Sequence, residues 1–303
     1  MVSEGRVAVA LRFSAPEAGG ARSGRLRAVD LLLLAYLTVV SIVAVVRASS
    51  RPGWWLVLVA HGLFVLLLFL LTRPNLGPLG RTLREIYPLL LLLGLYSELD
   101  VLNSGGGAVH DQIVQRWELF LFGTQISRAW WQAAPSMFWS TILHAAYLSY
   151  YFIVAAPALY FAWRGDLVAV RRFVLVVMAT FIVCYLVFLF FPVAGPYYQF
   201  PRPDPWFTDN LPARLAYQAL ASGSSYGAAF PSSHVAAALA ATLAAARISP
   251  RLGLILSVPT LLLTVGVVYC QMHYGVDALA GLAVGGLVTW AVGRNSVSGE
   301  EKR

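Results

Sequence analysis

Eight apolar runs that are long enough to cross a bilayer restrict the fold of this chain more than any other feature. They lie near residues 29–46, 54–72, 86–102, 137–163, 173–193, 231–248, 252–270 and 274–293. A helix needs about 20 apolar residues to cross a hydrocarbon core of about 30 Å. A soluble domain of 303 residues cannot enclose a chain that is 59% hydrophobic. We therefore predict an all-α, polytopic transmembrane helical bundle with about eight spans.

The distribution of basic residues predicts how this bundle is oriented. Sixteen of the 22 Lys and Arg residues fall on one side of the predicted spans, in both tails and in three short loops. Because basic residues gather in cytoplasmic loops, both termini are expected in the cytoplasm. The same distribution argues against nucleic acid as a partner despite the net charge of +8, since the basic residues do not share one soluble face.

Two longer segments, residues 103–136 and 194–229, then fall on the extracytoplasmic side. The first contains the amphipathic stretch QIVQRWELFLFG and three tryptophans, a pattern typical of a position along the membrane interface. The second is rich in Pro, Gly, Ser and Tyr. Because the cytoplasmic loops are short, chemistry that needs space is expected at the extracytoplasmic face.

The motif FPSSHVAAALA places Pro231 at the expected start of a helix, where its missing N–H costs nothing. The backbone N–H groups of Ser232, Ser233 and His234 then belong to the first turn and lack intrahelical acceptors, which makes this turn a natural cradle for a phosphate. An imidazole in this turn is able to pass a proton to a leaving oxygen. An ordinary Pro-Ser cap with a histidine at the interface explains the motif equally well.

A second motif, CQMHYGVDALAG, contains His273 and Asp277 four residues apart. This spacing places both side chains on one face of a helix, separated by about 6 Å of rise. A carboxylate in this position is able to hold the Nδ1–H of the imidazole and leave Nε2 free as a nucleophile. The alternative is an interfacial ion pair that caps the last helix, although an aspartate in an apolar helix start is costly without a purpose.

The order of the spans brings the two motifs together. The sixth span begins outside with His234 and the eighth begins outside with His273 and Asp277, so these side chains are expected at one membrane face. The fifth span ends at the same face with FFPVAGPYYQFPRPDPW. We predict as catalytic residues His273, Asp277 and His234. We predict as substrate-binding residues Ser232, Ser233, Tyr197, Tyr198 and Arg202.

Other polar and aromatic residues receive structural interpretations. His110 and Asp111 are interpreted as solvated loop residues, with a contact to a lipid headgroup as the alternative. Arg214 either supplies positive charge to the site or lies on the surface. His61 and His144 lie inside spans and are interpreted as hydrogen-bonded packing residues. The aromatic run within residues 147–152 is interpreted as helix packing, with lipid or substrate contact as the alternative.

The pair of motifs, PSSH and about 40 residues later HYGVD, resembles the second and third signature motifs of the type 2 phosphatidic acid phosphatase superfamily. The resemblance lies in the motifs over residues 190–293 and only in the architecture before them. It implies that His273 is the nucleophile and forms a phosphohistidine, that Asp277 orients it, and that His234 protonates the leaving group.

Two cations of the phosphatase branch of that superfamily are absent. The branch has a lysine seven residues before an Arg-Pro pair, but here Gly195 stands at that position before Arg202 and Pro203. It also has a Ser-Arg pair before the nucleophilic histidine, where this chain has Gly266 and Val267. The pattern is more similar to the inositol phosphorylceramide synthase branch, whose enzymes transfer a phospho-headgroup between lipids. A diester headgroup carries less charge than a phosphate monoester and needs fewer cations.

These observations predict an integral membrane lipid phosphotransferase or phosphatase. Its partners would be a phospholipid or lipid phosphate as substrate, a lipid hydroxyl or water as acceptor, and the bilayer. Transfer of a headgroup resembling inositol phosphate is favoured, and release of inorganic phosphate from a lipid phosphate or polyprenyl (di)phosphate is the alternative. A transporter or a non-catalytic lipid-binding protein would belong to a different class, and a transporter typically has ionisable groups near mid-membrane and matching halves.

The chain is predicted to contain a basic cytoplasmic tail (residues 1–28), one membrane catalytic domain (29–293, with core motifs at 190–293) and a second cytoplasmic tail (294–303). No cofactor or metal ion is expected, because the predicted site has one carboxylate and two histidines rather than the carboxylate cluster that Mg²⁺ prefers. Cys184 and Cys270, the two cysteines, both lie in apolar runs. A disulfide framework is therefore not expected.

Overall fold

A computed structural model describes the backbone of residues 26–104 and 109–300, with side chains up to residue 293. The regular structure in these ranges is helical, and an isolated bridge joins Val193 to Ala228. The predicted N-terminal tail lies almost entirely outside the described residues. The helices are α1 (Ala28–Val46), α2 (Trp54–Leu71), α3 (Pro78–Asn103), α4 (Asp111–Phe122), α5 (Ile126–Ala133), α6 (Met137–Leu148), α7 (Tyr150–Trp163), α8 (Leu167–Phe190), α9 (Pro196–Gln199), α10 (Pro205–Thr208), α11 (Leu211–Gly223), α12 (Ser233–Ile248), α13 (Pro250–Tyr269) and α14 (Gly275–Glu300).

Five helices within the described ranges are long and apolar enough to cross a membrane, namely α1, α2, α8, α13 and α14. A sixth crossing arises if α6 and α7, which meet at a 40° bend, form one broken span. The predicted all-helical, multi-pass architecture is confirmed, and the protein is an integral membrane protein. The count of eight spans and the cytoplasmic position of both termini stay predictions.

Helices occupy the two remaining predicted spans, but α3 and α12 do not meet the same criterion. α3 carries five charged side chains, which lower its hydropathy: Arg81, Arg84, Glu85, Glu98 and Asp100. α12 has 16 residues. At about 1.5 Å per residue it is about 24 Å long, shorter than a hydrocarbon core of about 30 Å. Charge in one helix and length in the other explain why the structure supports fewer spans than the apolar runs suggest.

The acidic side chain of Glu98 is buried among α1, α2 and α3 because it has partners on both neighbouring helices. It accepts a hydrogen bond from the Tyr36 hydroxyl at 2.8 Å and lies 2.8 Å from Nε2 of His61. Nδ1 of His61 lies 2.7 Å from the Ser41 hydroxyl. The interpretation of His61 as a hydrogen-bonded packing residue is confirmed. Because an unpaired carboxylate is costly in apolar surroundings, this network also fixes how the first three helices pack.

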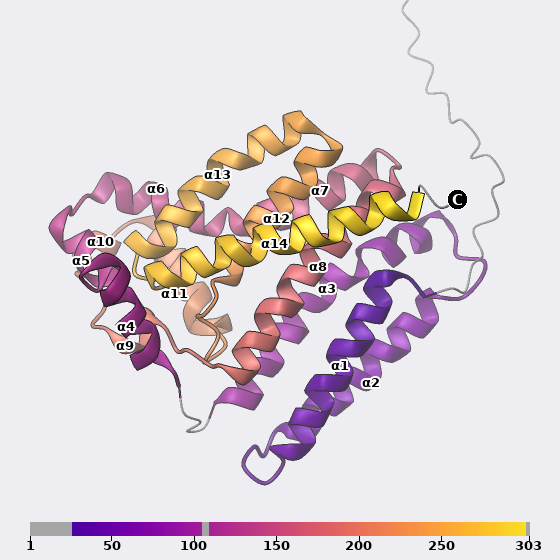
Figure 1. The fold of residues 1–303 in the computed structure, drawn as a ribbon, viewed down its shortest axis with the longest axis horizontal. Helices are drawn as coiled ribbons and strands as arrows, with labels where there is room; N and C mark the ends of the chain where they lie inside the picture. The colour runs from indigo at the N-terminus through magenta and orange to yellow at the C-terminus, as the bar shows by residue number, and fades with distance from the viewer. Residues whose placement is uncertain (1–25, 105–108, 301–303) are drawn as a thin grey trace, which may run out of the picture.

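α12 lies inside the bundle, in contact with α7, α8, α13 and α14 (Figure 1). Most of its buried side chains are alanines, and small side chains allow several helices to approach one axis closely. α14 contacts it through two glycines. A Cβ atom on Gly281 would lie 2.6 Å from the carbonyl oxygen of Ser232, and one on Gly285 would lie 2.5 Å from that of Ala236. These glycines therefore allow the two helix backbones to touch.

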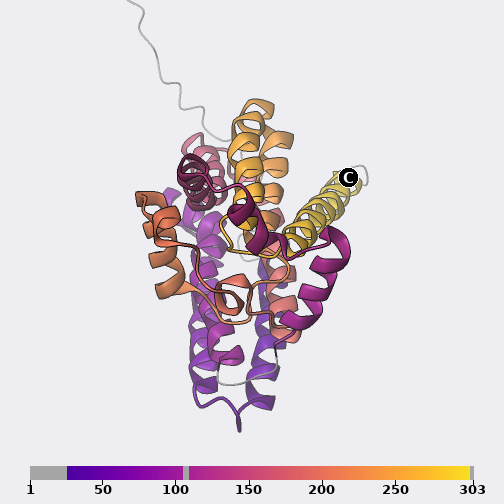
Figure 2. The ribbon, with the colours of Figure 1, turned by 90° about the vertical axis from the view of Figure 1, so that its left-hand side faces the viewer.

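The short helices gather at one end of the bundle. α4, α5, α9 and α10 lie near the beginning of α14, at the left of Figure 1. In Figure 2 this end faces the viewer, and α4 lies on the outside of the bundle. α4 contacts α14, and α5 contacts α13. Two of these short helices therefore lie beside the turn that joins α13 to α14.

Replacing Gly285 by alanine is expected to lower the unfolding temperature, because the added methyl group would lie 2.5 Å from a carbonyl oxygen of α12. Such overpacking costs about 1–3 kcal/mol. Gly286→Ala is the matched control: its methyl group would meet nothing within 4 Å, and both variants gain the same helix propensity of about 1 kcal/mol. Thermal unfolding in detergent compares the two. Equal unfolding temperatures would contradict the close packing of α12 and α14.

Candidate active site

The three residues predicted to be catalytic are distant in sequence and lie together in the structure. His234 stands in the first turn of α12, His273 in the turn between α13 and α14, and Asp277 in the first turn of α14. The centroids of the two imidazole rings are 5.7 Å apart. Nδ1 of His273 lies 3.5 Å from Oδ2 of Asp277. This arrangement arises because the N-terminal ends of α12 and α14 lie side by side.

The imidazole of His273 lies closer to a backbone carbonyl than to Asp277. Nδ1 of His273 donates to the carbonyl oxygen of Ala229 at 3.0 Å. Oδ2 of Asp277 accepts the N–H of Tyr274 at 2.8 Å. Because a carbonyl oxygen only accepts, Nδ1 carries the proton and the lone pair of the neutral ring lies on Nε2. Asp277 therefore acts on His273 mainly by fixing the turn that carries it, and the carbonyl of Ala229 orients the ring.

The PSSH turn has the geometry of a helix start, with one of its N–H groups already used. Ser232 is the N-cap of α12, and its hydroxyl accepts the N–H of Val235 at 3.4 Å. The N–H of Ser232 donates to the carbonyl oxygen of Asp277 at 2.9 Å. Ser233 and His234 are the first two residues of the helix, where N–H groups have no intrahelical acceptor. The predicted phosphate cradle is thus reduced from three N–H groups to two.

Two tyrosines from the bend between α6 and α7 enclose His234. The ring centroids of Tyr147 and Tyr150 lie 4.9 Å and 4.5 Å from that of His234. The Tyr147 hydroxyl lies 3.4 Å from Nε2 of His234. The sequence interpretation assigned these tyrosines to helix packing and missed their contact with the histidine. The sequence does not show which of these adjacent aromatic residues faces inward, because that depends on the bend at Ser149.

Two buried polar atoms at the site lack a hydrogen-bond partner among the described residues. They are Nδ1 of His234 and Oδ1 of Asp277. Buried polar atoms are almost always paired, and exceptions concentrate where a protein binds a ligand or stores strain. Both atoms belong to residues that the sequence predicts to be catalytic. A substrate that supplied a donor or an acceptor here would complete the site.

The interpretation of His110 and Asp111 as solvated loop residues is wrong for Asp111. That residue is 2% exposed, and its carboxylate accepts the N–H groups of Ala194 and Gly195, each at 2.8 Å. His110 stacks on Phe191 with ring centroids 4.2 Å apart. Both residues hold the segment that follows α8. The polar sequence around them gave no indication that they would be covered.

The positions of the two absent cations lie in closely packed parts of the structure. Gly195 has a φ of 91°, and a Cβ atom there would lie 2.8 Å from that of Ala229. On Gly266 a Cβ atom would lie 2.8 Å from the carbonyl oxygen of Leu143. Val267 is fully buried. A lysine at residue 195 would have to adopt a positive φ and would meet the Cβ atom of Ala229, and an arginine at residue 267 would place a long charged side chain in the buried core.

The predicted substrate-binding residues Tyr197 and Arg202 contact each other. Nη2 of Arg202 donates to the Tyr197 hydroxyl at 2.7 Å, and the guanidinium lies 4.6 Å from the centre of that ring and 5.7 Å from that of Tyr217. Tyr198 packs edge-on against both Tyr197 and Tyr226, with ring centroids 4.9 Å and 5.3 Å apart. These side chains form an aromatic layer, and no contact between this layer and the histidine pair is seen in the described structure.

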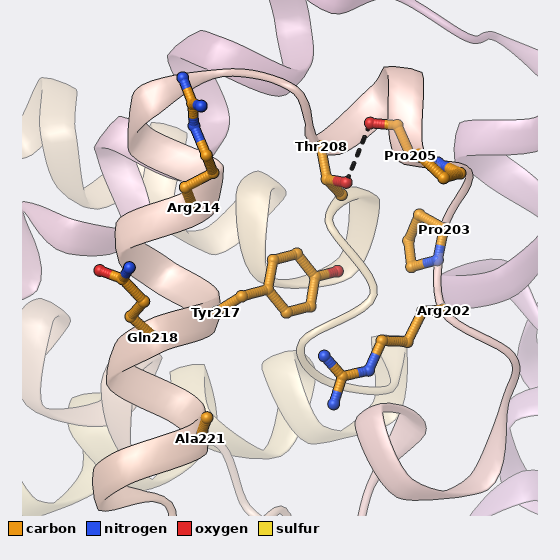
Figure 3. A pocket seen from close by; sticks show the side chains of 8 residues that line it. All are labelled: Arg202, Pro203, Pro205, Thr208, Arg214, Tyr217, Gln218 and Ala221. Atoms are coloured by element: carbon orange, nitrogen blue, oxygen red, sulfur yellow. Dashed lines mark hydrogen bonds between the residues drawn. The ribbon is translucent and has the colours of Figure 1, made fainter.

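A cavity of about 510 Å³ opens beside this layer (Figure 3). Its lining contains two arginines, three other polar side chains and no acid: Arg202, Pro203, Pro205, Thr208, Arg214, Tyr217, Gln218 and Ala221. The amide of Gln271, two residues before His273, donates to the carbonyl oxygen of Pro201 at 2.8 Å. The segment that contributes Arg202 and Pro203 to the cavity is therefore hydrogen-bonded to the turn that carries His273. Guanidinium and amide groups in this arrangement suit an anionic, hydroxyl-rich headgroup.

The surroundings of His273 keep its ring neutral at physiological pH. Burial lowers the pKa of His273 to about 4, and the hydrogen bond to the Ala229 carbonyl opposes that shift. A neutral imidazole with its lone pair on Nε2 is a competent nucleophile. Among residues 26–104 and 109–293, no group of three or more His, Cys, Asp or Glu side chains is arranged to hold a metal ion. The assembled groups suit nucleophilic attack with proton transfer.

Comparison with known proteins adds one finding. The sequence model of the PAP2 superfamily matches residues 113–291, more than half of the chain. The matched region begins in α4 and ends in α14, so it contains both histidine motifs. No curated protein and no solved structure matches the chain.

Acidification is expected to leave the His273 ring neutral well below the ordinary histidine pKa of about 6.5. The reason is that burial lowers its pKa to about 4, so the ring takes up a proton only near that pH. ¹⁵N NMR of histidine-labelled protein in micelles follows the titration, and the His273→Asn variant assigns the resonance. A midpoint near the ordinary value would contradict the buried position of this ring.

Proposed function

Since the chain belongs to the PAP2 superfamily, we propose that it transfers a phospho-headgroup between membrane lipids through a phosphohistidine on His273. Membership indicates a lipid phosphatase or phosphotransferase as the class of enzyme. The observation that carries the proposal is the contact between His234 and His273. Their ring centroids lie 5.7 Å apart, where the N-terminal ends of α12 and α14 lie side by side.

The proposed reaction has two displacement steps. In the first, Nε2 of His273 attacks the phosphorus, the bond between phosphorus and the lipid oxygen breaks, and His234 gives a proton to the departing alcohol. In the second, the hydroxyl of an acceptor attacks the same phosphorus, His234 takes up its proton, and the P–N bond to His273 breaks. Positioning, the nucleophile and the proton donor must all contribute, because phosphate esters are very slow to react unaided.

The two-residue cradle at the start of α12 supports a role in binding the phosphoryl oxygens. The N–H groups of Ser233 and His234 point out of the helix start, and the helix dipole adds to the attraction for an anion. The hydroxyl of Tyr147 lies 3.4 Å from Nε2 of His234 and would orient that ring for proton transfer. In this proposal Asp277 holds the His273 turn.

The closely packed positions at Gly195, Gly266 and Val267 favour the headgroup-transferring, inositol phosphorylceramide synthase-like branch. A phosphate diester brings one negative charge to the site, whereas a monoester brings up to two. With fewer cations nearby, a diester is the easier substrate to bind and to stabilise in the transition state. The cavity with Arg202 and Arg214 supplies a place for a headgroup that resembles inositol phosphate, and a lipid hydroxyl would then be the acceptor.

A phosphatase is the second candidate, and it differs only in the acceptor. If water reached the phosphohistidine, the same residues would release inorganic phosphate from a lipid phosphate or a polyprenyl (di)phosphate. The aromatic surroundings of the half-buried His234 disfavour water as the acceptor, because Tyr147 and Tyr150 pack against the ring.

The first test uses purified protein in detergent with headgroup-labelled phosphatidylinositol and a ceramide or diacylglycerol acceptor. The wild-type protein is expected to form a new labelled lipid, and His273→Asn to lower the rate at least about a thousandfold, because no other group supplies the nucleophile. His234→Ala is expected to cost about 10²–10⁴-fold, the usual effect of a general acid.

Parallel reactions with a lipid phosphate distinguish the two candidates. Inorganic phosphate without a new lipid would show a phosphatase instead of a transferase. Unchanged turnover in a folded His273→Asn protein would contradict the phosphohistidine mechanism for both.

Arg214→Ala is expected to raise KM for the labelled donor about two- to fivefold, the range for an exposed charge contact, with little change in kcat. Arg116→Ala on the exposed face of α4 is the matched control, because Arg116 does not line the cavity. Steady-state kinetics with the same lipids compare the two variants. An equal effect of both substitutions would argue for general surface charge rather than a headgroup site.

A further inference from the structure

Helix α4 carries two buried acids on a face that the proposed chemistry does not use. Asp111 is 2% exposed and Glu118 is fully buried, seven residues further along the same face. The opposite face presents Phe120, which is 87% exposed. Two carboxylates kept inward on such a helix need a reason, because burying a charge is costly unless hydrogen bonds compensate for it.

Glu118 is hydrogen-bonded to the start of α14. Its carboxylate oxygens accept the N–H of Gly275 at 3.1 Å and that of Val276 at 3.0 Å. These are the first two residues of the helix, whose N–H groups have no acceptor within it. Glu118 is therefore an N-cap supplied by another helix. It fixes the chain two residues after His273.

Asp111 binds the other side of the same turn. Oδ1 of Asp111 lies 3.0 Å from the hydroxyl of Tyr274, the residue after His273. The amide of Gln115, also on α4, donates to the same hydroxyl at 2.9 Å. Tyr274 is fully buried. Helix α4 thus holds both the side chain of Tyr274, which follows His273, and the backbone of residues 275–276.

Asp111 also supports the carbonyl that orients the His273 ring. It accepts the N–H groups of residues 194–195. The preceding residue, Val193, accepts the N–H of Ala229 at 2.9 Å, and the carbonyl oxygen of Ala229 receives Nδ1–H of His273 at 3.0 Å. The Asp111 carboxylate is therefore connected to the side chain of Tyr274 and, through residues 193–195 and Ala229, to the imidazole of His273.

We propose that Asp111 and Glu118 are positioning residues that hold His273 in line for attack on the phosphorus. This inference rests on the proposed function, because it assigns the two acids a part in phosphohistidine formation. Neither acid contacts the histidine itself. Each accepts more than one donor, so a carboxylate is required: an amide has one acceptor oxygen, and its NH₂ group would face a backbone N–H.

The test measures phosphohistidine formation in single turnovers with labelled lipid, for wild type, Glu118→Gln, Glu118→Asp and Asp111→Asn. The amide variants are expected to lower this rate and kcat about 10- to 100-fold, the usual effect of losing a supporting hydrogen bond to a reactive group. KM is expected to change less than about threefold, because the cavity is untouched. Glu118→Asp keeps a carboxylate and should recover part of the rate.

Asp204→Asn is the control, since Asp204 is exposed and its carboxylate caps no helix. A double variant adds a second measurement. If Asp111 acts through the Tyr274 hydroxyl, Asp111→Asn combined with Tyr274→Phe should cost less than the product of the two single effects.

The outcomes separate this inference from the proposed function. Absence of labelled histidine in the wild-type protein would refute the proposed function. Labelled wild type together with wild-type rates in Glu118→Gln and Asp111→Asn would overturn the positioning role alone. The absence of a thermal unfolding transition in both Glu118 variants would also overturn the positioning role, because the acid would then be needed for the fold rather than for the reaction.

Discussion

The contact between the beginnings of α12 and α14 is the constraint on which the rest of the site depends. Gly281 and Gly285 let the two backbones touch, and the N–H of Ser232 then reaches the carbonyl oxygen of Asp277 at 2.9 Å. This single arrangement brings the ring centroids of His234 and His273, from distant motifs, to 5.7 Å from each other. Larger side chains at the glycines would separate the helices, and with them these two histidines.

The second requirement is that the backbone N–H groups at these helix starts, which have no acceptor within the helix, find hydrogen-bond partners in apolar surroundings. α14 meets it with Asp277 from within and Glu118 from α4, so its first turn has no N–H left for an anion. α12 meets it only in part. This difference between the two helix starts fits the different roles proposed for them, in which one holds His273 as the nucleophile and the other leaves two N–H groups for an anion.

The sequence predicted the helices and the meeting of His234 with His273, because the alternation of spans assigns each motif to a membrane face. It did not predict the partners of those histidines. The carbonyl of Ala229 and the hydroxyl of Tyr147 come from loops and bends whose course depends on packing rather than on periodicity. Asp111 was misinterpreted for a related reason: a short polar segment looks the same in sequence whether water or backbone N–H groups surround it.

The short length of α12 has a consequence for where the reaction takes place. A helix of about 24 Å that reached one boundary of a hydrocarbon layer of about 30 Å would begin about 6 Å below the other. His234 stands in the first turn of α12. Under the proposed function, a phosphate that met His234 at that depth would have left the headgroup plane and much of its hydration, and the acyl chains that remain in the bilayer would have to offset that loss. Depth alone would then discriminate against water-soluble phosphate esters, which have no such anchor.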